Sequence, residues 1–358
     1  MGVRYSLFGL LIIITSFAFG QTIVRGPYLQ MLSDDQVVVR YRTSTPVPTE
    51  VQAGTNLGVF TESYSDATTT TEHEAVFTGL SADTRYYYAI TQNGNPLLGV
   101  NSNRYFQTAP TTGSKQAIRA WILGDCGTGN NNARSVRNAY YNYVGSQHTD
   151  LMLMLGDNAY PNGTDAEYQG AVFQNMYEAL LARTPLFPTQ GNHEFYNGYT
   201  SSTSGNGPYY DIFTLPTSAE LGGMASGTEA YYSYDYGNVH FISLDSHDSD
   251  RSPTGPMLTW LQNDLAMNQQ EWIIVYFHHP PYTKGSHDSD NIFDSGGRMH
   301  DMRQNVLPIL ENYGVDLVLS GHSHSYERSF LLEGHFGNSN TLTNAMILDG
   351  GDGRSNGD

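Results

Sequence analysis

Five apolar segments in the second part of the chain each end in a short polar motif, and this repeated pattern limits the possible folds more than any other feature. The segments cover residues 118–123, 151–155, 185–189, 272–277 and 315–319. Helical patterns occur between these segments, at residues 133–144, 165–183, 256–267 and 302–312. A β-hairpin is expected from the strands at 231–236 and 239–244. Alternating strands and helices are typical of a layered α/β domain, whose sites form at the carboxyl ends of the strands. The sequence therefore predicts that the five motifs meet at one edge of such a domain.

The motifs consist of residue types that bind metal ions. They are Gly124-Asp125-Cys126-Gly127, Gly156-Asp157-Asn158-Ala159-Tyr160, Gly191-Asn192-His193-Glu194, His278-His279-Pro280 and Gly321-His322-Ser323-His324. The glycines allow tight turns that aim side chains into a shared cavity, and oxygen and imidazole donors without thiolate suit iron, manganese or zinc. A single aspartate at a strand end is more often a helix cap, and a single buried histidine usually only completes a hydrogen bond. Repetition at five strand ends favours a metal site over both alternatives.

Residues 22–110 show a different pattern, in which short β-rich segments are joined by polar turns. We expect strands at residues 36–42, 50–53, 74–77, 84–91 and 104–108, with Asn93-Gly94 as a tight hairpin turn. The predicted fold is an antiparallel β-sandwich. The run with Leu80, Thr84, Tyr86, Tyr88 and Ile90 resembles the penultimate strand of fibronectin type III domains. Residues 109–114 read as a linker, so we expect a β-sandwich at 22–110 and an α/β domain at 117–358.

The two ends of the chain carry further expectations. Residues 1–20 contain Arg4, an apolar run and then small residues, which is the order of a secretory signal peptide. The run is shorter than the roughly 20 residues of a membrane span, and no later segment is a candidate span. We therefore expect export, with a secreted, periplasmic or cell-surface location, rather than a retained membrane anchor. A strand is predicted at 345–348 shortly before the chain stops at Asp358, so we expect the α/β domain to be incomplete at its C-terminus.

Charge and cysteine content exclude several classes of protein. Acidic residues outnumber basic ones 35 to 17, for a formal net charge of −18, and no basic stripe is present. Nucleic acid is therefore excluded as a stably bound partner. The same charge would repel an anionic substrate unless cations lay nearby, which is a second reason to expect bound metal. The single cysteine, Cys126, excludes an internal disulfide and a cysteine-based zinc finger.

The motifs together resemble those of the calcineurin-type metallophosphoesterases and, among these, of the purple acid phosphatases. Most of that superfamily begins with Asp-x-His, whereas the position two places after Asp125 is a glycine, so one histidine ligand is missing. Tyr160, three residues after Asp157, matches the tyrosine that replaces this ligand in purple acid phosphatases. Residues 322–328 resemble the closing motif of the family, and a β-domain before the catalytic domain matches its usual layout.

This resemblance implies an α/β/β/α catalytic domain with a binuclear centre of one ferric ion and one divalent ion of zinc, manganese or iron. By position, the implied ligands are Asp125, Tyr160 and His324 for the ferric ion, Asn192, His278 and His322 for the divalent ion, and Asp157 as a bridge. His193 and His287 match positions that contact phosphate and assist the leaving oxygen, which is general acid work. The implied function is an exported acid phosphatase that hydrolyses phosphate monoesters through attack of a metal-bound hydroxide.

Two departures leave parts of this assignment open. Asp288 follows His287 where plant members commonly carry a second histidine, so leaving-group protonation and the pH optimum can differ. His279 follows the expected ligand His278, and alternation along the preceding strand lets only one of them face the cavity. The family register favours His278.

Two other functions remain compatible with the motifs. A phosphodiesterase or nucleotidase of the same superfamily would use the same metal ligands, so only assays on monoesters and diesters separate it from a monoesterase. A surface binding protein with an inert phosphatase-like domain would have no chemical need for seven coordinating side chains, and all seven positions are filled.

Overall fold

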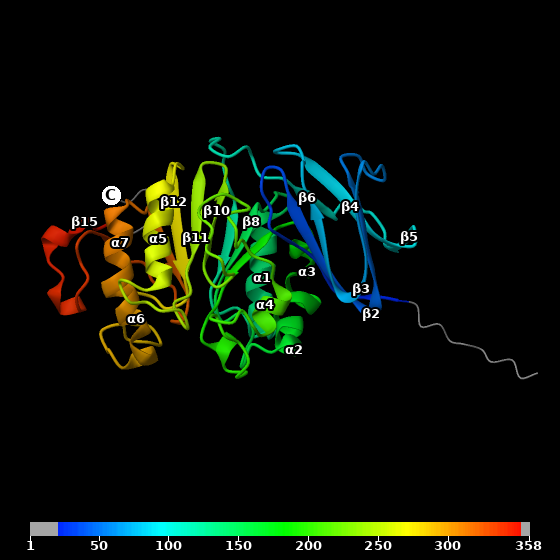
Figure 1. Ribbon diagram of the computed structural model, residues 1–358. Coiled ribbons are helices and arrows are strands. Elements are labelled where there is room, and N and C mark those ends of the chain that lie inside the picture. Colours follow the sequence, from blue (N-terminus) through cyan, green and yellow to red (C-terminus); the bar gives the residue numbers. More distant parts are fainter. Residues whose placement is uncertain (1–20, 352–358) are drawn as a thin grey trace, which may run out of the picture.

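The computed structural model describes residues 21–351, which form an antiparallel β-domain and an α/β domain that lie side by side (Figure 1). The predicted fold class is therefore confirmed. The predicted signal peptide, residues 1–20, lies outside the described residues. Within the described range, no helix combines the length and the apolar character that a membrane span requires.

The β-domain is one branched antiparallel sheet built around the long strand β2 (Val37–Gly54). This strand pairs with β1 (Ile23–Gln30), β3 (Glu62–Phe77) and β4 (Arg85–Gln92), while β5 (Asn95–Leu98) and β6 (Tyr105–Gln107) pair with β4. The expectation of two separate strands at 36–42 and 50–53 is wrong. The polar residues between them interrupt the alternation of side chains, but pairing with β3 continues across two register shifts.

Two local contacts lie at the two ends of β4. Asn93 and Gly94 form the predicted turn between β4 and β5, with φ of 50° and 75°, as a two-residue hairpin requires. Tyr86 Oη accepts a hydrogen bond from the backbone N–H of Ser81 at 3.0 Å. A tyrosine corner of this kind accompanies immunoglobulin-like sandwiches. The contact supports the resemblance to fibronectin type III domains, which stays a prediction.

The α/β domain contains two sheets that pack face to face. The first consists of the parallel strands β7 (Ala120–Leu123), β8 (Leu151–Leu155) and β9 (Leu186–Thr189). The second contains the predicted hairpin of β10 (Tyr232–Tyr236) and β11 (Val239–Ser243), followed in parallel by β12 (Trp272–Phe277) and β13 (Leu317–Ser320). Phe187 of the first sheet stacks on Tyr234 of the second with 3.9 Å between ring centroids. A separate pair, β14 (Leu331–Leu332) and β15 (Ile347–Asp349), follows.

Helices cover the outer faces of both sheets (Figure 1). On the second sheet, α5 (Pro256–Met267) and α7 (Leu307–Asn312) share an apolar core with β11 and β12. On the first sheet, Tyr140 of α1 (Asn131–Val144) stacks on Trp121 of β7 with 4.0 Å between ring centroids. The other helices are short: α2 (Asp165–Tyr168), α3 (Glu178–Leu181), α4 (Pro208–Ile212) and α6 (Arg298–Asp301).

Two of the predicted helices are interrupted. In residues 165–183 a π-helical segment separates α2 from α3, and Asn175 within it has a φ of 57°. Arg137 of α1 donates hydrogen bonds to the backbone carbonyls of Asn175 and Met176. In a regular helix these carbonyls would accept from backbone N–H groups of the same helix. In residues 302–312, Pro308 has no N–H to donate, and regular α-helix begins only at α7.

The two domains share one apolar core. Leu29 of β1 forms a parallel bridge with Pro185, directly before β9. The predicted linker at 109–114 is itself held, because the N–H of Gly113 donates to the carbonyl of Gly237 at 2.7 Å. The exact boundary stays a prediction, but the β-domain is packed against its neighbour and is not loosely tethered.

His240 of β11 is a buried imidazole between two carboxylates. Its Nδ1 lies 2.7 Å from Asp235 Oδ1, and its Nε2 lies 2.9 Å from Asp264 Oδ2. Burial lowers the pKa of His240, but the hydrogen bonds to both carboxylates outweigh burial and raise the pKa to about 9. A group with a raised folded-state pKa stabilises the fold fully below its unfolded pKa of 6.5, and that stabilisation is lost as pH rises through about 9.

We therefore expect the free energy of unfolding to fall by about 3 kcal/mol more in wild type than in His240→Gln between about pH 6 and about pH 10. Urea unfolding of both proteins at the two pH values measures the difference. His300→Gln, a partly buried histidine of α6, is the matched control and should follow wild type. Identical pH dependence in wild type and His240→Gln would contradict the prediction.

Candidate metal centre

The five polar motifs meet at the carboxyl ends of the strands that precede them. The loops after β7, β8 and β9 carry Asp125, Asp157 and Asn192, while His278 and His322 follow β12 and β13. The two sheets lie face to face, so residues far apart in sequence converge. The structure thus brings the predicted residues into one cluster, although their assignment as metal ligands stays a prediction.

Close backbone approach explains the glycines of the motifs. A Cβ atom at Gly191 would lie 2.2 Å from Asp157 Oδ1, and one at Gly156 would lie 2.5 Å from His278 Nδ1. Any larger residue would push these loops apart. Asp125 and Asp157 themselves have φ of 52° and 54°, a left-handed conformation that aspartate tolerates better than most residues.

A first group of donor atoms surrounds the phenol of Tyr160. Tyr160 Oη lies 3.1 Å from Asp125 Oδ1, 3.0 Å from Asp157 Oδ2 and 3.1 Å from His324 Nε2. His324 Nε2 is also 3.4 Å from Asp125 Oδ1. The family resemblance implies Asp125, Tyr160 and His324 as ligands of the ferric ion and Asp157 as the bridge, and these four side chains lie together here.

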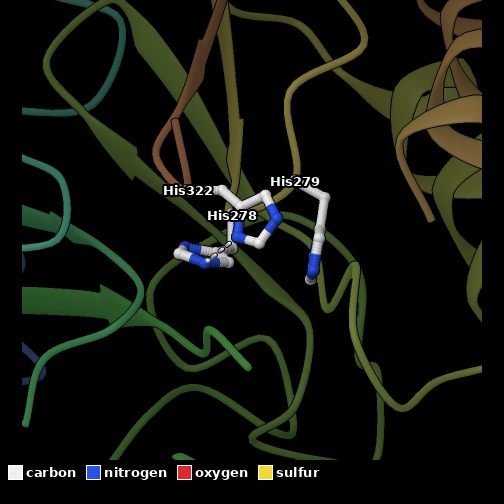
Figure 2. Close-up of side chains that lie close together, drawn as sticks. All are labelled: His278, His279 and His322. Carbon is white, nitrogen blue, oxygen red and sulfur yellow. Dashed lines mark hydrogen bonds between the residues drawn. The ribbon is translucent and has the colours of Figure 1, made fainter. Parts of the chain in front are cut away.

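A second group surrounds Nε2 of His278. This atom lies 3.1 Å from Asn192 Oδ1, 3.1 Å from His322 Nδ1 and 3.5 Å from Asp157 Oδ2. The other ring nitrogen, Nδ1, donates to the carbonyl of Leu155 at 2.9 Å and so fixes the ring. Figure 2 shows the contact between His278 and His322.

The spacing fits two metal ions that share Asp157. Atoms about 3 Å apart can serve as neighbouring ligands of an ion whose bonds are ~2.1 Å long. One ligand atom from each of Asp125, Asp157 and His278 lies within 4.8 Å of the others. The donors are carboxylate, phenol and amide oxygens with imidazole nitrogens, which suits iron, manganese or zinc. The arrangement is consistent with a binuclear metal centre.

The electrostatics of both groups favour a cation. Burial, together with the carboxylates of Asp125 and Asp157, raises the pKa of Tyr160, so the phenol keeps its proton. A cation among these oxygens would stabilise phenolate and carboxylates alike. Burial lowers the pKa of His278, but Asp157 outweighs it and raises the pKa to about 9. Metal binding at His278 therefore competes with a proton.

Glu194 connects the loops that carry Asp157 and Asn192 by accepting hydrogen bonds from their backbone N–H groups. It is fully buried, and its carboxylate accepts hydrogen bonds from the backbone N–H groups of Asp157 at 3.0 Å, Asn158 at 2.7 Å and Gly191 at 2.6 Å. The sequence places Glu194 inside a motif but gives no sign of this function, because the side chain faces backbone groups and not the donor atoms.

The two histidines predicted to contact substrate flank the cluster. His193 Nδ1 donates to the carbonyl of Pro161 at 2.6 Å. His287 Nδ1 lies 2.9 Å from Asp294 Oδ1, and its ring stacks on His322 with 3.9 Å between centroids. Asp294 was not among the predicted site residues, and no periodicity or motif marks it.

His279 has a different environment from its neighbour His278. Its Nδ1 lies 2.9 Å from Ser246 Oγ, and the two adjacent rings are nearly perpendicular, at 89°. A ligand atom of His279 does fall within 4.8 Å of those of His278 and His322. However, His278 Nε2 faces Asn192 Oδ1 and Asp157 Oδ2, whereas the ring contact of His279 is with Ser246, and this difference favours His278 as the ligand.

Comparison with known proteins relates the chain to phosphoesterases. The model of the family "Calcineurin-like phosphoesterase" matches residues 118–326. Purple acid phosphatase 23 of Arabidopsis thaliana is 27% identical over 284 residues, covering 72% of this chain and 57% of that protein. Purple acid phosphatase 22 of the same plant is 29% identical over 262 residues, covering 72% and 53%. An uncharacterized protein of Mycobacterium tuberculosis is 29% identical over 364 residues, covering 88% and 64%. The chain thus spans little more than half the length of the two plant relatives.

Two solved structures share the fold. Purple acid phosphatase PPD1 from yellow lupin seeds has a TM-score of 0.62 at 16% identity, covering 83% of this chain and 57% of that one. PhoD has a TM-score of 0.60 at 16% identity, covering 83% and 71%. At such low identity the likeness shows the fold alone.

Proposed function

The chain belongs to the calcineurin-like phosphoesterase family, and from this premise we propose that it is a metal-dependent phosphatase of the purple acid type that hydrolyses phosphate monoesters. One observation carries the proposal: two groups of donor atoms share Asp157, and Tyr160 lies in the group that lacks the usual histidine of the superfamily. The names of the plant relatives support the same choice.

In this proposal the chain holds a ferric ion and a divalent ion. Two such ions would supply Lewis-acid activation of water and neutralise charge on the phosphoryl group. The chain itself fixes the ligands through outer hydrogen bonds. His278 Nδ1 donates to Leu155, and Asn192 Nδ2 donates to Tyr196 Oη at 3.0 Å. The proposed ligands are Asp125, Asp157, Tyr160 and His324 for the ferric ion, and Asp157, Asn192, His278 and His322 for the divalent ion.

His193 and His287 are the proposed groups that act on the substrate. In each, Nδ1 is occupied by an acceptor, the Pro161 carbonyl or the Asp294 carboxylate, which leaves Nε2 for another partner. We assign His193 to binding a phosphate oxygen. We assign His287 to protonating the leaving oxygen, which matters most when that oxygen is strongly basic.

His287→Ala should therefore retain both metals but lower kcat by about a hundredfold for alkyl phosphates and much less for nitrophenyl phosphate, whose leaving group needs little protonation. Steady-state kinetics on both substrates, with metal analysis of each preparation, test this. His300→Ala is the matched control and should behave as wild type. Equal losses on both substrates would contradict the acid role, and loss of metal would show that His287 binds metal itself or positions the proposed ligand His322.

Substrate class is tested by comparing phenyl phosphate with diphenyl phosphate. The proposal expects faster hydrolysis of the monoester. Preference for the diester would favour a phosphodiesterase or nucleotidase. Failure to hydrolyse either ester by protein that contains two metals would favour a binding protein with an inert domain.

We also propose that the protein is exported, because residues 1–20 have the order of a signal peptide. N-terminal sequencing of protein recovered from the cell envelope or the medium should show a chain that begins near Gln21. Recovery of the full-length N-terminus in the cytosol would contradict export.

A further inference from the structure

We infer that the β-domain positions the metal-binding loops of the α/β domain through Asp165, the first residue of α2. The contact consists of Arg25 of β1, Arg42 of β2 and Asp165, and we call these three residues the Asp165 network. The inference goes beyond the proposed hydrolysis, because it assigns the β-domain a function in the site of its neighbour.

The network fixes the start of α2 to two strands of the β-domain. Arg42 binds Asp165 through both carboxylate oxygens, with Nη1 2.7 Å from Oδ2 and Nη2 2.6 Å from Oδ1. Arg25 Nη2 lies 2.9 Å from Oδ1 and 3.2 Å from the backbone carbonyl of Asp165. The Arg25 guanidinium is buried and lies 4.9 Å from the centroid of the Phe173 ring. A bidentate contact between arginine and a carboxylate fixes both the distance and the relative orientation of the two side chains. A shift of α2 relative to the β-domain would therefore break the contact between Arg42 and Asp165.

From α2 the path continues to the metal-binding loops. Tyr168, at the end of α2, is fully buried, and its Oη donates to Glu194 Oε1 at 3.2 Å. Glu194 holds the backbone N–H groups of Asp157, Asn158 and Gly191. These groups belong to, or lie next to, the proposed ligands. The path therefore consists of the ion pairs at Asp165, the single turn of α2 from Asp165 to Tyr168, and the hydrogen bonds of Tyr168 and Glu194, which are contiguous in space.

A second branch runs to the phenol ligand. Only four residues separate Tyr160 from Asp165. Glu167 Oε2 closes this segment by accepting from the N–H groups of Asn162 at 3.1 Å and Thr164 at 2.9 Å. A loop that is short and internally bonded has little freedom to absorb a shift of α2. Movement at Asp165 would therefore reach Tyr160 as well.

The test uses two changes that keep side-chain shape, because asparagine at position 165 still offers an oxygen acceptor to the buried guanidinium of Arg25, which a smaller residue would not. Asp165→Asn weakens the first link, and Tyr168→Phe deletes only the hydroxyl of the middle link. Glu50→Gln is the matched control, because the bonds of Glu50 to Thr91, Asn93 and Gly94 stay inside the β-domain.

Amide hydrogen exchange in metal-free protein is the first readout, so its outcome does not depend on the proposed phosphatase activity. We expect exchange at Asp157, Asn158 and Gly191 to become about tenfold faster in both variants. Exchange of the core amides of β8 serves as the reference for global unfolding. Exchange in Glu50→Gln should match wild type.

Binding of Mn²⁺ alone is the second readout. Loss of an outer support typically weakens metal binding by about 10-fold or more, and we expect this in Asp165→Asn and Tyr168→Phe but not in Glu50→Gln. If both variants melt at lower temperature yet keep wild-type exchange and Mn²⁺ affinity, the β-domain only stabilises the fold and the inference is overturned. Failure of wild type to bind Mn²⁺ would instead count against the proposed metal centre.

Discussion

Asp157→Asn should lower phosphoester hydrolysis by at least about a thousandfold and remove one or both metal ions. Asp157 is the one residue of the described cluster that lies in both donor groups, with Oδ2 3.0 Å from Tyr160 Oη and 3.5 Å from His278 Nε2. A neutral amide keeps the shape but loses the charge that offsets two cations. The other oxygen, Oδ1, already accepts the N–H of His193 at 2.9 Å, so the orientation of the side chain should survive the change.

Initial rates and metal content by mass spectrometry, measured on the same preparations, test this prediction. Asp150→Asn is the matched control, because it makes the same change at the opposite end of β8, where Asp150 Oδ2 accepts from the N–H of Arg119 at 2.7 Å. The control should retain metal and activity. An Asp157→Asn protein with wild-type metal content and rate would refute the shared-ligand arrangement.

The sequence predicts which residues meet in this cluster, because each of the five motifs directly follows a recognisable apolar strand. An apolar strand followed by glycine and a polar donor specifies both the position and the direction of that donor. This pattern places the motifs that contain Asp125, Asp157, Asn192, His278 and His322 at one edge of the domain, and the structure brings these residues together.

Contacts that depend on tertiary packing could not be predicted in the same way. Arg25 and Asp165 are 140 residues apart, and nothing in the local pattern links them. Asp294 meets His287 only because the loop between β12 and α6 folds back on itself. The break after α2 is stabilised by Arg137 from another helix, so residues 165–183 alone read as continuous helix. Residue propensity and hydrophobic periodicity indicate the structure of a single segment. They do not indicate which side chains of two distant segments will contact each other.

Tyr160→Phe should abolish the visible colour of the iron-loaded protein and weaken iron binding by about 10- to 100-fold. Light absorption of this kind arises from electron transfer between a phenolate and a ferric ion, so it requires the phenol oxygen itself. Tyr160 Oη is 3.1 Å from Asp125 Oδ1 and from His324 Nε2, within the donor group that lacks the usual histidine. Phenylalanine keeps the ring and its packing against His193, with 4.4 Å between the ring centroids, and deletes only the ligand atom.

Visible spectra and iron content of wild type, Tyr160→Phe and Tyr196→Phe decide the assignment. Tyr196 is the matched control because its Oη contacts Asn192 Nδ2 at 3.0 Å, beside the cluster but outside the first donor group. The control should keep its colour, since no phenolate to iron bond is changed. A ferric ion acidifies bound water more than a divalent ion does, so wild type should also remain active in mildly acidic solution, and Tyr160→Phe should lose that activity first. A colourless, iron-free wild type with full activity on zinc or manganese would contradict the purple acid type and favour a metallophosphoesterase in which Tyr160 only packs against its neighbours.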